Sequence, residues 1–102
     1  MSHPALLLTV KAKSKLSLEE VTRVMESRMN EFRALEGLKQ KYYVVEPSTG
    51  EIGGVYLWES VEALDAYRES ALRATIAEAY QTEGEPRVEV LKVIAPLRDR
   101  PL

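Results

Sequence analysis

The apolar residues of this chain change their period along the sequence, and the order of these changes constrains the fold more than any other feature. In residues 5–12 apolar and polar side chains alternate with a period of two, which predicts a strand. In residues 18–32 the apolar positions recur every three or four residues, which predicts an amphipathic helix. Ser17 and Glu20 have the spacing of a capping box at its start, and Gly37 predicts its end.

The middle of the chain predicts a β-hairpin followed by helices. Residues 38–46 and 52–59 are rich in valine, tyrosine and other strand formers, and they flank the turn sequence Pro-Ser-Thr-Gly. Ser60 is placed to cap the next helix, and Ser70 separates it from a second helical stretch over residues 72–80.

Residues 87–95 alternate again and predict a last strand, which Pro96 ends. The predicted order is βαββαβ, which is typical of the ferredoxin-like α+β fold with a four-stranded antiparallel sheet. We therefore expect residues 1–102 to form one domain of this class, with helices on one face of the sheet.

The first and last strands are apolar on both faces, which is unexpected for a sheet covered on one side only. In the last strand Val88 and Val90 point to one face, and Leu91 and Val93 point to the other. A second apolar face needs a cover, and the simplest cover is the same face of a second copy. The sequence therefore predicts a homodimer formed through the sheet face.

Composition removes several classes of function. The 14 basic and 16 acidic residues are interspersed, so the basic stripe typical of a nucleic-acid protein is missing. There is no cysteine, and the single histidine is His3, which argues against thiol catalysis and against a metal site. The apolar run near the N-terminus is too short for a signal peptide or a membrane span, so we expect a cytoplasmic protein.

The aromatic residues all fall in the middle of the chain and suggest a ligand cavity between the hairpin and the helices. Tyr56 and Trp58 share one strand face, whereas Tyr42 and Tyr43 point to opposite faces. Rings with phenol hydroxyls suit a small flat organic ligand, and the alternative is that they only fill the core. The full set is Phe32, Tyr42, Tyr43, Tyr56, Trp58, Tyr67 and Tyr80.

Two further features of the hairpin leave alternatives open. Lys41 shares a strand face with Tyr43, so it lies either at a strand edge in water or in a cavity as a cation. The pair Gly53-Gly54 indicates either a bulge or tight packing, or else the close approach of a ligand or partner.

The hairpin and the helix after it resemble the YdhR-like monooxygenases of the dimeric α+β barrel superfamily, which includes the antibiotic-biosynthesis monooxygenases. The resemblance rests on Gly37-Leu38, on the string Gly53-Gly54-Val55-Tyr56-Leu57-Trp58, and on Ala66-Tyr67. It implies a ferredoxin-like subunit, a dimer whose sheets form a barrel, and a pocket in each subunit. Haem-degrading relatives place an iron-ligating histidine where Ala77 stands, which argues against that activity here.

The resemblance implies a cofactor-independent monooxygenase that oxidises a small aromatic or polyketide-like substrate with molecular oxygen. In this hypothesis Lys41, Tyr56 and Trp58 are the catalytic candidates, and Lys41 or a tyrosine hydroxyl stabilises the phenolate. The substrate-binding candidates are Phe32, Tyr43 and Tyr67. The alternative is a non-catalytic dimeric module that binds a small hydrophobic metabolite.

Overall fold

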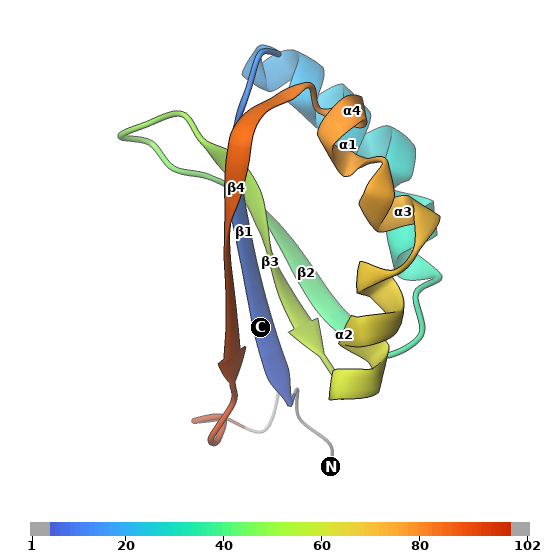
Figure 1. Cartoon of the computed structure of the whole chain (residues 1–102). Coiled ribbons are helices and arrows are strands. Elements are labelled where there is room, and N and C mark those ends of the chain that lie inside the picture. Colours follow the sequence, from blue (N-terminus) through green and yellow to red (C-terminus); the bar gives the residue numbers. More distant parts are fainter. Residues whose placement is uncertain (1–4, 99–102) are drawn as a thin grey trace.

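The computed structural model describes residues 5–98, which form a four-stranded antiparallel sheet with all helices on one side (Figure 1). The strand order is β2-β3-β1-β4, and the observed element order confirms the predicted ferredoxin-like α+β fold. The strands are β1 (Leu6–Ser14), β2 (Leu38–Val45), β3 (Ile52–Trp58) and β4 (Thr82–Lys92). The helices are α1 (Leu18–Arg33), α2 (Val61–Arg68), α3 (Ala71–Ala74) and α4 (Ile76–Ala79). The prediction for His3 lies outside the described residues.

Serine caps begin the helices where the sequence predicts them. The Ser17 hydroxyl accepts a hydrogen bond from the Glu20 backbone N–H at 3.1 Å, and the Ser17 N–H donates to the Glu20 carboxylate at 2.9 Å. At the start of α2, the Ser60 hydroxyl accepts a hydrogen bond from the Ala63 N–H at 3.1 Å. The first helix ends at Arg33, earlier than predicted, and Gly37 then turns the chain into β2 with a positive φ of 83°.

The last strand begins earlier and ends earlier than the predicted range 87–95. β4 already pairs with β1 at Thr82 and ends at Lys92, so Ile94 lies beyond it and is 97% exposed. The pairing shifts register between Lys11 and Lys13 of β1, and the extra residues of β4 in that irregular stretch include Gly84 and Pro86. A bulge tolerates a glycine at positive φ and a proline without an N–H, so these residues bend the strand and do not delay its start.

The second helical stretch also differs from its prediction. It is divided at Thr75 into two short helices, α3 and α4, although Ser70 separates it from α2 as expected. The Thr75 hydroxyl donates to the Ala71 carbonyl at 3.0 Å and the Leu72 carbonyl at 3.2 Å. Such local hydrogen bonds compete with continuation of the helix.

The inner face of the sheet, which the helices cover, carries the core. The buried cluster contains residues of β1, β3, α1 and α2. Its members are Leu6, Leu8, Phe32, Tyr56, Trp58, Leu64 and Tyr67. The opposite face, which we call the outer face, has no helix over it in Figure 1. Strand pairing places six apolar residues there: Leu7, Tyr42, Val44, Val55, Leu57 and Leu91. Tyr42 and Tyr43 thus point to opposite faces, as predicted.

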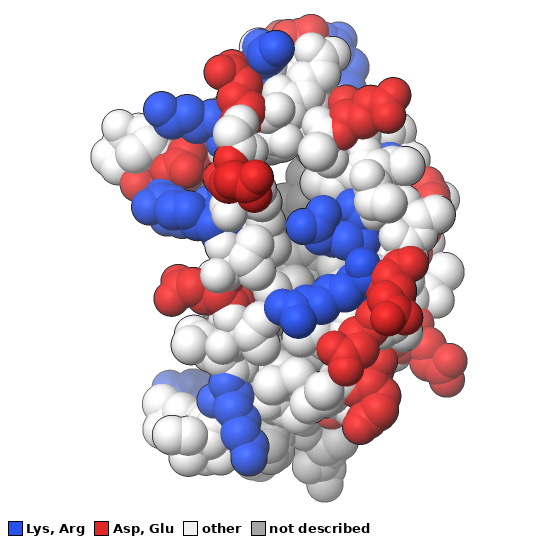
Figure 2. Space-filling view, viewed as in Figure 1, with Lys and Arg blue, Asp and Glu red and all other residues white. Residues whose placement is uncertain are grey.

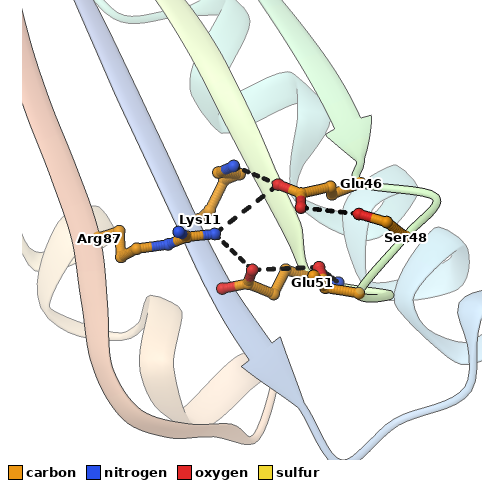
Figure 3. A network of polar contacts seen from close by, with 6 residues as sticks. Lys11, Glu46, Ser48, Glu51 and Arg87 are labelled. Atoms are coloured by element: carbon orange, nitrogen blue, oxygen red, sulfur yellow. Dashed lines mark hydrogen bonds and ion pairs between the residues drawn. The ribbon is translucent and has the colours of Figure 1, made fainter.

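A polar network ties the hairpin turn to the outer face at one end of the sheet (Figure 3). Lys11 of β1 donates to the Glu46 carboxylate, and Arg87 of β4 pairs with Glu51 and lies 3.7 Å from Glu46. The Ser48 hydroxyl donates to Glu46 at 3.1 Å. The hydrogen bond from Lys11 lowers the pKa of Glu46 and keeps it charged. Because the partners come from three separate segments, the network favours a single register of the hairpin on the sheet.

Candidate functional site

A cavity of about 330 Å³ lies between the inner face of the sheet and the helices. We call it the main cavity, and its volume is at the lower end of the range for ligand sites. Its wall includes Val10, Met25, Lys41, Tyr43, Tyr56, Tyr67, Arg73 and Tyr80. Figure 2 shows the surface hollowed between β4 and the short helices, with basic groups on the helix side of the hollow and acidic groups on the strand side.

Lys41 points into this space from β2. Its Nζ lies 3.4 Å from the ring centroid of Phe32, 4.3 Å from that of Tyr43 and 4.5 Å from that of Tyr56. Of the two positions that the sequence allowed, the structure therefore has the one facing the cavity. Among residues 5–98, no ion pair links its amine to a carboxylate. The side chain of Lys41 also lines a second cavity of about 420 Å³ beside Phe32 and Met29.

The surroundings of Lys41 disfavour its charged form. Burial away from water is the larger effect and the nearby Arg28 guanidinium is the smaller, and together they lower the pKa of Lys41 from 10.5 to about 7. The ring faces attract the ammonium and act in the opposite direction. Arg28 lies on α1, and its guanidinium donates hydrogen bonds to the Leu72 carbonyl at 3.0 Å and to the Thr75 hydroxyl at 2.9 Å. At neutral pH a large fraction of Lys41 is therefore an uncharged amine.

Unlike Lys41, the tyrosines of the main cavity keep their protons at neutral pH. The hydroxyls of Tyr56 and Tyr67 lie 3.4 Å apart, and burial raises the pKa of both phenols. Burial also raises the pKa of Tyr80 to about 12. Since a neutral phenol can donate a hydrogen bond, the site combines O–H donors with an amine that is able to accept a proton.

The structure brings the six predicted site residues together, but in different positions relative to the main cavity. Lys41, Tyr43, Tyr56 and Tyr67 line it, whereas Phe32 lies beside the second cavity. Trp58 has no exposed surface and stacks behind Tyr56, with ring centroids 6.2 Å apart and planes at 6°. Within residues 5–98 the indole N–H has no hydrogen-bond partner. We therefore expect Trp58 to position the tyrosine rings.

The two adjacent glycines serve close packing. A Cβ at Gly53 would lie 1.9 Å from the Val10 carbonyl oxygen of β1, so the neighbouring backbone occupies that space. A Cβ at Gly54 would lie 2.9 Å from the Tyr56 ring and 3.1 Å from Cε of Lys41. Tight packing, one of the two predicted alternatives, is confirmed, and Gly54 leaves room for two side chains of the site.

Several cavity residues were not predicted from the sequence. Arg73 comes from α3, and Glu85 and Pro86 come from the irregular start of β4. Nothing in their spacing distinguishes them from ordinary helix and strand residues. Ala77 also lines the cavity, so the position of the histidine in haem-degrading relatives carries a methyl group here.

Two other findings concern the described residues, 5–98. None of their helices is long and apolar enough to cross a membrane. They contain no group of three or more acidic, histidine or cysteine side chains that could hold a metal ion.

Comparison with known proteins identifies the family. The family model described as "Putative mono-oxygenase ydhR" matches residues 7–93. No curated protein matches the sequence. Among solved structures, the NE2512 protein of unknown function from Nitrosomonas europaea aligns with a TM-score of 0.76 at 14% identity, covering 99% of this chain and 100% of the other.

Two further similar structures are described as oxygenases. A "putative antibiotic biosynthesis monooxygenase" from Caulobacter crescentus CB15 has a TM-score of 0.75 at 14% identity, covering 91% of this chain and 92% of its own. A variant of SnoaB, a cofactor-independent oxygenase from Streptomyces nogalater, has a TM-score of 0.75 at 10% identity, with coverages of 94% and 99%. Because this family model matches residues 7–93, which is most of the chain, the chain belongs to the family described as "Putative mono-oxygenase ydhR".

Proposed function

We propose that this protein is a cofactor-independent monooxygenase that oxidises a small phenolic, polyketide-like compound with molecular oxygen. The observation that carries the proposal is Lys41, an amine with a pKa of about 7 enclosed by aromatic rings at the wall of a 330 Å³ cavity. The similar fold of SnoaB, described as a cofactor-independent oxygenase, supports the same conclusion. Because a fold alone does not determine an activity, the residues of the site are the stronger support for this function.

In the proposed reaction Lys41 first accepts the proton of the substrate hydroxyl. The resulting ammonium then lies beside the phenolate, and protonated phenols of the cavity donate hydrogen bonds to the same oxygen. A phenolate is electron-rich enough to reduce oxygen itself. One oxygen atom forms a bond to a ring carbon and becomes a carbonyl, the O–O bond breaks, and the other oxygen leaves as water with two hydrogens from the substrate. A hydroxynaphthalene or an anthrone would thus give the corresponding quinone.

Oxygen uptake tests this proposal. We expect the purified protein to consume oxygen with one or more members of a panel of hydroxynaphthalenes and anthrones, and to release the quinone. Loss of the proton acceptor in Lys41→Met should lower the rate by about two orders of magnitude, the usual scale for a general base. Lys39→Met is the matched control, because Lys39 lies on the same strand, is exposed and pairs with Glu59 at 3.9 Å. Its rate should equal that of the unchanged protein.

The pH dependence gives a second readout of the same experiment. Tyr43 and Tyr56 contact Lys41, and burial raises the pKa of both phenols, so they stay protonated near neutrality while Lys41 titrates there. Because an ammonium cannot accept a proton, the rate should rise with pH through about 7, and this step should be absent in Lys41→Met. Binding of the phenols without oxygen uptake would contradict the oxygenase and support the alternative, a non-catalytic binding module.

We also propose that the protein acts as a homodimer through the outer face. Leu91 is 51% exposed and Tyr42 is 37% exposed on this face, while the neighbouring charges of Lys11 and Arg87 are already paired within the chain. An exposed apolar patch of this kind suits a self-complementary contact. A second copy would remove this surface from water.

Sedimentation velocity tests the dimer. We expect the unchanged protein to sediment as a dimer and Leu91→Glu to sediment as a folded monomer, because a buried carboxylate on each side opposes association. Leu18→Glu is the control, since Leu18 is comparably exposed, at 59%, on the helix layer. A monomeric parent protein, or a dimeric Leu91→Glu, would contradict this interface.

A further inference from the structure

The structure contains an amine that differs from an ordinary surface lysine in three respects. Its Nζ lies among the faces of Phe32, Tyr43 and Tyr56, and the side chain is half-buried. No carboxylate within residues 5–98 forms an ion pair with it. It also reaches empty space, since Lys41 lines both the main and the second cavity.

These are the conditions under which a lysine becomes a nucleophile. An amine attacks a carbonyl carbon only in its uncharged form, and an apolar setting without a carboxylate favours that form. The lowered pKa of Lys41 agrees with this geometry. The positive charge of Arg28 disfavours the ammonium further. The aromatic walls also suit a planar aromatic partner, which can stack on the rings.

We propose that Lys41 is a covalent binding site at which an aromatic aldehyde or ketone in the cavity forms an imine. Nζ adds to the carbonyl carbon, and the carbonyl oxygen takes up a proton to give a carbinolamine. The C–O bond then breaks and the oxygen leaves as water, so that one amine and one carbonyl give one imine and one water. No electron acceptor is needed. The protonated phenols of Tyr43 and Tyr56 line the same cavity and are available as proton donors to the leaving oxygen.

This inference goes beyond the proposed oxygenase function, because imine formation needs no oxygen and oxygenation needs no imine. Imine formation can therefore be absent while oxygenation occurs, and the reverse is equally possible. A compound with both a phenol and a carbonyl group, as in many aromatic polyketides, would meet Lys41 through whichever group lies closer to Nζ.

Reductive trapping tests the inference without air. The protein is incubated near pH 7 with benzaldehyde and sodium cyanoborohydride under nitrogen, which converts an imine into a stable benzyl amine. Peptide mapping separates labelling of the α-amino group, whose pKa is near 8, from labelling of lysines, and among the lysines we expect one benzyl group, on Lys41. An exposed lysine has a pKa near 10.4, so its uncharged fraction at pH 7 is about a thousandfold smaller. Allowing for the lower nucleophilicity of a weaker base, we expect Lys41 to react at least about tenfold faster than any other lysine.

Two variants and one second probe make the test decisive. Lys41→Met should lose the adduct, whereas Lys39→Met should retain it in full. Glycolaldehyde, which is small and polar, should label Lys41 with less preference than benzaldehyde, because it gains nothing from the rings. Labelling spread evenly over the lysines, or lysine labelling that is undiminished in Lys41→Met, would overturn the proposal.

Discussion

Replacing Gly53 by alanine is expected to lower the free energy of unfolding by about 4 kcal/mol, a size reserved for severe steric conflicts. The added methyl carbon would lie 1.9 Å from the Val10 carbonyl oxygen and 2.9 Å from its carbon, and both belong to the backbone of the neighbouring strand. No side-chain rotation relieves that contact, so the pairing of β1 with β3 has to open. The loss should appear in urea denaturation followed by circular dichroism, with the variant and the unchanged protein compared at the same concentration.

Gly54→Ala is the matched control for this prediction. Its Cβ would meet the Tyr56 ring at 2.9 Å and the end of the Lys41 chain at 3.1 Å, both of which are side-chain atoms. We expect a stability loss less than half as large, together with a displaced Lys41 and therefore a lower rate of oxygen uptake. Equal stability losses in the two variants would contradict the view that Gly53 is required by the backbone and Gly54 by the site.

Replacing Trp58 by alanine should lower the free energy of unfolding by about 3–5 kcal/mol, the usual cost of removing a fully buried large ring. Trp58 has no exposed surface, and its ring lies 6.2 Å from that of Tyr56 and 5.2 Å from that of Tyr67. In a domain of this size such a loss corresponds to a decrease in Tm of about 12–40 °C. Thermal unfolding at fixed concentration measures it.

Trp58→Phe distinguishes a packing role from a chemical one. It keeps an aromatic ring against Tyr56 and Tyr67 and removes an indole N–H that has no hydrogen-bond partner within residues 5–98. We expect less than half the stability loss of Trp58→Ala and nearly unchanged oxygen uptake per folded molecule. A large loss of activity in a stable Trp58→Phe would show instead that the indole takes part in the chemistry.

The elements of the fold were predictable because their signals are local. The hydroxyls of Ser17 and Ser60 satisfy free N–H groups within their own first turns, so the same few residues carry both the signal and the structure. The start of β4 was not predictable, because Gly84 and Pro86 resemble a loop. Only the bulge in the pairing with β1 gives them a place in a strand.

Several side chains that meet at the cavity were predicted from the sequence, but their geometry was not. A period of two places Lys41 and Tyr43 on one face, but it cannot tell whether that face is covered by helices or by water. The answer depends on Phe32 of α1 and Tyr56 of β3, which approach Lys41 only when the layers pack. Arg73 and Tyr80 reach the cavity for the same reason.

The sequence by itself determined the order of strands and helices, the caps and the aromatic character of the site, since these depend on residue type and on neighbours along the chain. The tertiary structure decided which face encloses Lys41, how large the cavity is, and that burial lowers the pKa of this lysine to about 7. Lys41 is buried only when several segments of the chain pack around it. For that reason the basicity of one amine, on which the proposed chemistry depends, appears only after the chain has folded.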